Sequence, residues 1–304
     1  MAIQKEIWED HIEGNLFKNN EFLLASADAS QYVLQGKVVH IPQAGAIPGV
    51  SVNRSSLPAT VGQRTDTDVT YELDEYTTDP ILIPNADTIE LSYNNRENVL
   101  AESQAIIRQT TAENLLVTWA PSASTHLMLT TGASVTAHLA GTTGNRKKFV
   151  VNDLKYAQLL LNKQNIPLED RYALISADMF QQLTDDMSQT QYRDFSVAFD
   201  AKNGIVGKLF GFNIIMRSSV LVYSDDSTPI VRAAGAATAV TDNDAVLCWH
   251  THAVERAVGD VLFFEKTGDP LYYGDVYSVC VRMGGRKRRN DEKGIIAIVQ
   301  NQAS

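Results

Sequence analysis

The stretch NNRENVLAESQAIIRQTTAENLLVTW, residues 94–119, is the strongest helical pattern in the chain. Asn94, with Glu97 three positions later, is typical of a helix N-terminus, and Pro121 predicts where the helix ends. At about 1.5 Å per residue a continuous helix here is about 39 Å long, enough to span a molecule of this size. Its apolar stripe is predicted to consist of Val99, Ile106, Leu115 and Trp119.

Two strands are expected before this helix. KVVHI, 37–41, and DVTYELDEY, 68–76, have strand patterns, and the second alternates strictly between apolar and polar residues. The 26 residues between them, 42–67, are rich in Gly, Pro, Ala and Ser and lack a helical pattern. Connections this long inside a domain tend to be functional or disordered. The segment therefore predicts a long projecting two-stranded loop. Farther upstream, residues 3–17 predict a short amphipathic helix that gains order by lying on another surface.

A denser pattern of helices and strands follows a Ser/Thr/Gly/Ala-rich boundary at 122–146. Helices are predicted over 153–164, capped by Asn152, and over 177–187, capped by Ser176. A charged turn is predicted at 284–294, GGRKRRNDEKG, and a polar surface excursion at 225–244. Strands are predicted at 172–175, 212–216, 245–249, 260–265, 275–283 and 295–299.

Composition excludes several classes of protein. A net charge of −10 disfavours sequence-specific binding of nucleic acid, which needs a basic face. No run of eighteen apolar residues predicts a membrane helix, and the charged start MAIQKEIWEDHIEG argues against a cleaved signal peptide. The only cysteines, Cys248 and Cys280, are typical of buried thiols in a reducing cytoplasm.

Catalytic motifs are nearly absent. GTTGNRKK, 141–148, lacks the spacing of a phosphate-binding loop, and no dinucleotide or nucleophile-elbow motif occurs. Cys248, His250 and His252 form the one close Cys/His cluster, which is compatible with a three-ligand metal site or with a hydrolase-like cytoplasmic enzyme. We favour a core cysteine beside two ordinary imidazoles. No catalytic residue, metal or cofactor is therefore predicted.

Charged clusters outside this region are interpreted as structural. The carboxylate pairs are predicted to be solvated surface groups: Asp66/Asp68, Asp185/Asp186, Asp225/Asp226 and Asp242/Asp244. The basic run Arg286, Lys287, Arg288 and Arg289 has two interpretations that the sequence leaves open. It is either a solvated turn or an electrostatic contact to an acidic neighbour or to packaged nucleic acid.

Three segments carry a resemblance to a known family. YELDEYTTDPILIPNADTIELSYNNRENVLAE (71–102), GIVGKLFGFNIIMRSSVL (204–221) and AVERAVGDVLFF (253–264), with the order of the predicted elements, resemble the major capsid proteins of tailed bacteriophages. The resemblance implies an α+β chain with the Hong Kong 97-type capsid fold. That fold has an N-arm, an extended β-hairpin loop, a peripheral domain with a long spine helix, and an α/β axial domain.

The resemblance also implies a division of the chain. The expected parts are the N-terminal arm at 1–36, the extended loop at 37–83, the peripheral domain at 84–146, the axial domain at 147–275 and returning C-terminal strands at 276–304. Because the extended loop begins near Lys37, no large N-terminal scaffolding segment is expected. Lys37 is the only lysine between residues 19 and 146, which argues against covalent crosslinking through that loop.

Function follows from the resemblance as a set of expectations. The chain would form the pentamers and hexamers of an icosahedral head, located in the virion and assembled in the host bacterial cytoplasm. Its expected partners are copies of itself, scaffolding, portal and decoration or head-completion proteins, and packaged double-stranded DNA bound without sequence specificity, with no membrane. The residues predicted to contact neighbouring subunits are Ile3, Ile7, Trp8, Ile47, Val50, Val52, Leu57, Val61, Arg286, Lys287, Arg288 and Arg289.

Overall fold

The computed structural model describes residues 20–34, 37–43, 53, 67–84, 95–200, 203–225 and 228–303 of the chain. The amphipathic helix expected over 3–17 and the cap expected at Asn94 lie outside these residues. Nearly all of the loop expected between the first two strands also lies outside them.

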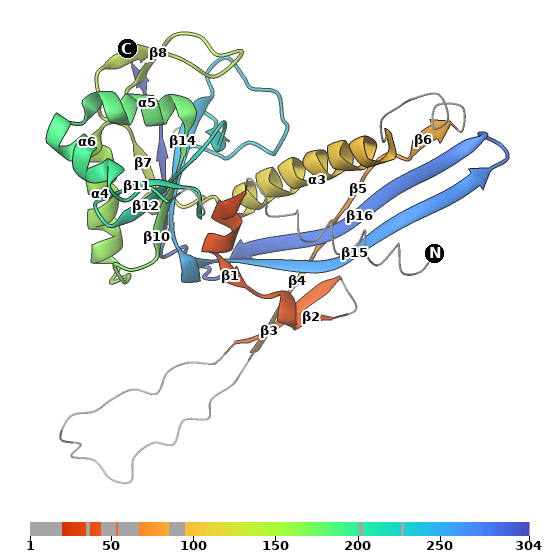
Figure 1. The fold of residues 1–304 in the computed structure, drawn as a ribbon. Coiled ribbons are helices and arrows are strands. Elements are labelled where there is room, and N and C mark those ends of the chain that lie inside the picture. The colour runs from red at the N-terminus through yellow and green to blue at the C-terminus, as the bar shows by residue number, and fades with distance from the viewer. Residues whose placement is uncertain are drawn as a thin grey trace.

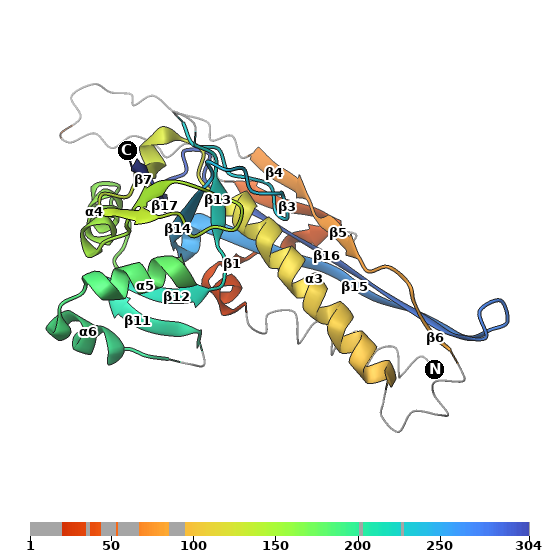
Figure 2. The same ribbon diagram turned by 90° about the horizontal axis from the view of Figure 1, so that it is seen from above.

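An α/β body and a long extension make up the molecule (Figure 1). The extension consists of helix α3, Asn95–Trp119, and a hairpin of strands β15, Val254–Asp269, and β16, Gly274–Lys287. Both views show α3 running beside this hairpin for much of its length (Figure 2). The single long helix that the sequence predicts is therefore confirmed.

The buried face of helix α3 contains both apolar and polar residues. Ile107, Leu115, Leu116 and Trp119 are buried, and the indole nitrogen of Trp119 donates a hydrogen bond to the Glu255 backbone oxygen at 3.1 Å. The predicted stripe is wrong at one position, because Ile106 is 65% exposed. Nine positions separate Ile106 from Leu115, and about 100° of rotation per residue places them on opposite sides of the helix.

Close packing of α3 on the hairpin depends on Gly285. A β-carbon at this position would lie 2.6 Å from Leu115 Cδ2 and 2.4 Å from the Glu255 backbone oxygen. The glycine pair at the start of the predicted charged turn instead belongs to β16, which continues to Lys287. The turn was predicted too early because both glycines serve close packing of the sheet, Gly285 against α3 and Gly284 against Leu73.

The extension is built on a five-stranded sheet. Strand β16 pairs along one edge with β15, and along the other with β5, Asp74–Thr77, and β6, Ile81–Pro84. Strand β1, Ala27–Asp28, adds to β15 in parallel. A domain boundary at 275–276, as expected from the sequence, would separate two paired strands of this sheet.

A seven-stranded mixed sheet forms the centre of the α/β body. Its strand order is β11-β12-β10-β14-β17-β7, with β13 also paired to β14. The bounds are β7 Leu127–Leu129, β10 Arg171–Ser176, β11 Ile205–Leu209, β12 Phe212–Arg217, β13 Leu221–Tyr223, β14 Asn243–His250 and β17 Ile295–Val299. Every residue of β14 is buried, as a continuous apolar run predicts for a central strand.

Two apolar clusters cover the two faces of this sheet. Leu247 and Trp249 face the cluster that includes the C-terminal end of α3, where Trp119 and Trp249 have ring centroids 6.1 Å apart. Val246 and Cys248 face the other cluster, beneath helices α4, Val151–Lys163, and α5, Ala177–Asp186. The body is therefore a three-layer arrangement joined to the extension through Trp119.

A small separate sheet lies at the two ends of the segment expected to form the extended loop. Strand β3, Val38–Gln43, pairs with β2, Val33–Leu34, and with β4, Thr67–Glu72. The single strand expected over 68–76 is two strands, because the chain changes partner at Leu73. This leucine is buried, and its backbone nitrogen donates to the Lys37 oxygen at 2.8 Å.

Other predictions about individual elements are confirmed or corrected. Ser176 caps α5, since its hydroxyl accepts from Met179 N, whereas the N-cap of α4 is Val150 and not Asn152. Elements that the sequence did not predict include α6, Gln189–Ser196, with strands β8, Ser134–Thr136, β9, Asn145–Lys147, and β18, Gln302–Ala303. Short 3-10 helices span Glu21–Ala25, Ser30–Tyr32, Ser124–His126 and Thr251–Ala253. None of the described helices combines the length and apolarity needed to cross a membrane.

Candidate assembly surfaces

The Cys/His cluster has the environment of a protein core. Cys248 is fully buried on β14, and burial raises the pKa of its thiol. A nucleophilic or metal-binding cysteine needs the opposite shift, because the thiolate is the reactive form. The Nδ1 atom of His250 accepts a hydrogen bond from the His252 backbone nitrogen at 3.1 Å. Within the described residues, no group of three or more His, Cys, Asp or Glu side chains is placed to hold a metal ion.

One of the carboxylate pairs contradicts its prediction. Asp242 and Asp244 are buried, although they were expected at the solvated surface. The Arg232 guanidinium binds both oxygens of Asp242, at 2.8 Å and 3.1 Å for the shortest contacts. Asp244 lies 2.9 Å from His138 Nε2. Both carboxylates can be buried because the fold brings a cationic or hydrogen-bonding partner to each of them.

The basic run makes its contacts within the chain. The buried Glu255 carboxylate binds Arg286 Nε at 2.5 Å and Arg288 Nε at 3.3 Å. The Arg286 guanidinium also lies over the Tyr71 ring, 5.5 Å from its centroid. It thereby joins the hairpin to β4, at the base of the projecting loop. Neither interpretation of this run anticipated an internal role for Arg286.

Glu292 organises the junction between α3, the hairpin and the body. Its carboxylate accepts hydrogen bonds from Ser122 N, Ser122 Oγ and Ala123 N, and binds Lys287 Nζ at 2.7 Å. Burial opposes the charge, but the Lys287 ammonium and these donors outweigh it and lower the pKa of Glu292 to about 2. Lys287 also donates to the Ala120 oxygen at 3.0 Å. Lys287 and Glu292 therefore both bind the backbone that directly follows α3.

A groove of about 470 Å³ runs between α3 and strands β5 and β6. Its apolar lining includes Ile81, Ile106 and Ile107. Its acidic lining consists of Asp79 and of Glu75, whose carboxylate also binds Arg282 at 2.9 Å. The exposed position of Ile106 is thus part of a concave surface. An apolar groove with an acidic edge suits an apolar segment that carries positive charge.

The end of the hairpin presents a second apolar surface. Leu271, Tyr272 and Tyr273 are 78%, 59% and 79% exposed in the turn between β15 and β16. The Asp269 carboxylate holds this turn, since it accepts from Leu271 N at 2.9 Å and binds Lys266 Nζ at 2.8 Å. Adjacent large apolar side chains held in solvent indicate an interaction site.

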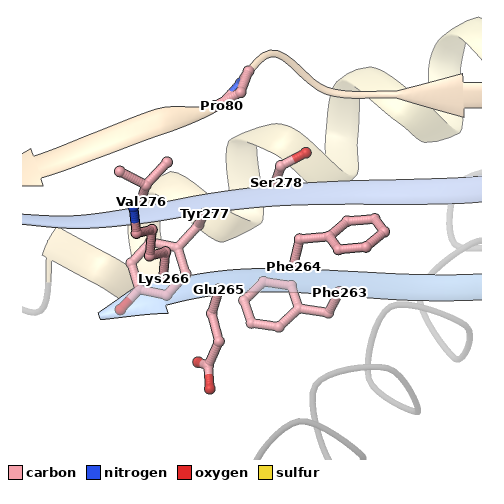
Figure 3. A pocket seen from close by; sticks show the side chains of 8 residues that line it. All are labelled: Pro80, Phe263, Phe264, Glu265, Lys266, Val276, Tyr277 and Ser278. Atoms are coloured by element: carbon pink, nitrogen blue, oxygen red, sulfur yellow. The ribbon is translucent and has the colours of Figure 1, made fainter. Parts of the chain in front are cut away.

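The same hairpin carries an open apolar hollow of about 370 Å³ along its side. Figure 3 shows the aromatic rings of Phe263 and Phe264 on one strand, with Tyr277 and Ser278 on the other. Phe263 stacks on Tyr277 with ring centroids 5.8 Å apart, whereas Phe264 is half-exposed. The hairpin therefore carries two separate apolar surfaces, with the charged residues Glu265 and Lys266 between them.

None of the predicted contact residues that the structure describes lies on the observed surfaces. The eight apolar candidates, Ile3, Ile7, Trp8, Ile47, Val50, Val52, Leu57 and Val61, all lie outside the described residues. The groove and the hairpin turn were missed. The run Leu271-Tyr272-Tyr273 beside Gly274 is an apolar turn, and this pattern could have predicted the exposed surface from the sequence. The groove had none, because its walls come from separate parts of the chain.

The described architecture defines a class of protein. A spine helix beside a long hairpin, the strand pair β3 and β4, and an α/β body constitute the Hong Kong 97-type capsid fold. The solved capsid of cyanophage P-SCSP1u is similar, with 19% identity, a TM-score of 0.64, and coverage of 92% of this chain and 87% of that one. The capsid of Ralstonia phage GP4 is similar at 13% identity and a TM-score of 0.66, covering 92% and 88%. A virus-like particle from Pyrococcus furiosus matches at 9% identity and a TM-score of 0.55, covering 97% and 99%.

The sequence profile of the phage capsid protein family matches residues 19–299, and the chain belongs to this family. It is a structural protein of the virion that forms a shell with copies of itself. No curated protein sequence matches it significantly.

Proposed function

We propose that this chain is the major capsid protein that builds the pentamers and hexamers of an icosahedral head, and that it has no enzymatic activity. The head would enclose double-stranded DNA without sequence specificity and assemble in the host bacterial cytoplasm. The observation that carries the proposal is the pair of exposed apolar surfaces on the extension, the groove and the hairpin turn. The described part of a single subunit leaves both uncovered, whereas neighbours in a closed symmetric shell can cover them.

The parts of the chain divide differently from the sequence-based scheme in this proposal. Both strands of the hairpin, 254–287, belong with α3 in the peripheral domain, because they pair with each other and pack against that helix. The axial domain then comprises 120–253 together with 288–303. The arm at 1–36 keeps its expected bounds. Strands β5 and β6, within the loop expected at 37–83, pair with β16 and on the same ground belong with the peripheral domain.

The extended loop of a neighbouring subunit is the proposed occupant of the groove. Residues 44–65 carry Arg54 and Arg64 and no acidic side chain, and they include the apolar candidates Ile47 to Val61. The groove offers the complementary surface, with Glu75 and Asp79 beside its isoleucines. Burial of apolar area in this contact contributes about 25 cal/mol per Å². Repetition over the shell multiplies each weak contact.

Further contacts are proposed for the remaining candidates. Ile3, Ile7 and Trp8 of the arm would lie on a neighbouring subunit. Arg288 and Arg289 are partly exposed despite their internal partners, so they retain surface for an acidic neighbour. Scaffolding, portal and decoration proteins would complete the head.

Ile106→Asp tests the groove without disturbing the core. The side chain is exposed in the single subunit, so the variant should fold normally, but docking of the loop would then bury a carboxylate where an apolar side chain had been, which costs free energy. We expect closed shells from the wild-type chain in negative-stain electron microscopy and sedimentation, and dispersed subunits from the variant. Leu168→Asp adds the same charge at a residue that is 60% exposed and outside the groove, and should still assemble. Normal shells from Ile106→Asp would exclude the groove as a contact.

Replacement of Tyr272 and Tyr273 by serine tests the hairpin turn. Both rings lie in solvent, so the free energy of unfolding of the subunit should change by no more than about 0.5 kcal/mol. Shell yield in sedimentation should fall at least severalfold, because two aromatic anchors are lost from each subunit. A double variant that assembles with unchanged yield would show that the turn is not an interface.

A further inference from the structure

A half-buried histidine attaches one loop to the α/β body. His138 follows β8, and its Nε2 atom lies 2.9 Å from Asp244 Oδ2, with the two side chains only 14% and 3% exposed. The other ring nitrogen, Nδ1, is buried without a hydrogen-bond partner in the described part of the chain. The contact with Asp244 is therefore the one polar interaction found for this ring.

Asp244 connects the histidine to a helix terminus. The same carboxylate oxygen accepts a hydrogen bond from Ser176 Oγ at 2.5 Å. Ser176 is the N-cap of α5 and accepts in turn from Met179 N. The three side chains do not form a nucleophilic triad, because the serine donates to the carboxylate and not to the imidazole.

The loop that carries His138 has few other attachments. Residues 137–144 are mostly exposed or half-exposed. Their contacts with the neighbouring excursion include Thr143 N to the Val240 oxygen at 3.1 Å and Thr238 Oγ1 to the Ala140 oxygen at 2.5 Å. Arg146 Nη1 also donates to the Thr143 oxygen at 3.2 Å. With so few attachments, the ionic contact of His138 contributes strongly to how often this loop opens.

The charges around His138 come from three elements. Asp244 lies on β14, Asp178 in the first turn of α5, and Arg146 on β9, while Asp242 is neutralised by Arg232. Burial by itself lowers the pKa of His138, but the hydrogen bond and charge of Asp244, with the charge of Asp178, outweigh both burial and Arg146. The pKa of His138 is consequently raised above its ordinary 6.5.

We propose that His138, Asp244 and Ser176 form a pH-dependent latch that holds the segment 137–144 against β14 and the start of α5 while the imidazole is protonated, and releases it on deprotonation. The sign follows from linkage. A histidine that binds its proton more tightly in the closed state stabilises that state fully below pH 6.5, and this stabilisation is lost as the pH rises through the raised pKa. Between pH 6.5 and the raised pKa of His138, the equilibrium constant for opening of the segment 137–144 rises by up to about tenfold per pH unit.

Two measurements on the full-length protein test the latch. Hydrogen exchange at the imidazole C2 position, followed by mass spectrometry across pH, reports the pKa of His138 in the wild-type chain, and we expect a value above 6.5. Amide exchange of peptides covering 137–144 reports opening. At each pH the wild type is compared with His138→Gln, which keeps a hydrogen-bond donor but cannot titrate, so intrinsic exchange cancels.

The expected result is slower exchange of 137–144 in the wild type than in His138→Gln at pH 6, with the difference shrinking as the pH rises. His252→Gln, at an exposed position, should behave as the wild type does. A measured pKa at or below 6.5 would overturn the latch. So would parallel exchange profiles of the wild type and His138→Gln. If His138→Gln does not fold, the C2 measurement alone decides.

Discussion

Removal of residues 44–64 is expected to yield soluble, folded subunits that form no shells. The register of the loop base makes a clean deletion possible, because Gln43 pairs with Thr67 and the deletion leaves Thr65 and Asp66 as a two-residue turn. Changing those two residues to Asn-Gly supplies the preferred hairpin turn. The deletion takes away the proposed occupant of the groove while leaving the described core untouched. Sedimentation velocity and electron microscopy are the measurements.

A second variant keeps the loop but reverses its charge, and so tests the electrostatic part of the contact alone. Arg54→Glu combined with Arg64→Glu keeps the length and the apolar residues, but places negative charge against Glu75 and Asp79. We expect shell yield to fall and to recover partly at high salt, because exposed charges are screened there. Shells of normal yield from the deletion variant would refute the loop as a principal contact. Normal yield from the charge variant alone would remove only the electrostatic part.

Substitution of Glu292 by glutamine is expected to cost the unassembled subunit about 3 kcal/mol of unfolding free energy, because it leaves the Lys287 ammonium without its anion in a partly buried site. Urea denaturation of dispersed subunits measures this loss. Asp291→Asn is the matched control in the same turn. Asp291 pairs with Arg289 at the surface, so this change should cost less than about 1 kcal/mol. Equal losses of unfolding free energy from the two substitutions would show that the buried junction stabilises the subunit no more than the surface ion pair does.

The pH dependence of stability provides an independent check on Glu292. Its pKa is lowered from 4.5 to about 2, so the carboxylate stabilises the fold fully above pH 4.5. This contribution is lost as the pH falls from 4.5 toward 2, where the folded protein also becomes protonated. Acid unfolding of the wild type should therefore be steeper in this window than that of Glu292→Gln. An unchanged acid profile in the variant would contradict the assignment.

Much of the fold was accessible from local patterns in the sequence. The helix at 94–119, the cap at Ser176 and the apolar strand at 245–249 were predicted because backbone geometry repeats over a few residues. Less of the candidate site was accessible. The turn at 271–273 had a local signal, but the groove beside Ile106 did not, since one wall is a helix and the other a strand from an earlier segment.

The sequence by itself determined the long spine helix, the strands β10, β12, β14 and β17 of the α/β body, the absence of familiar catalytic motifs and the resemblance to capsid proteins. The tertiary structure decided which charged side chains are buried or paired and which strands are neighbours. It buried Asp242 beside Arg232, changed the partner of the strand at Leu73, and engaged Arg286 with Glu255. Periodicity within an element is set by neighbouring residues, whereas burial and pairing depend on groups brought together from distant parts of the chain, which no local pattern records.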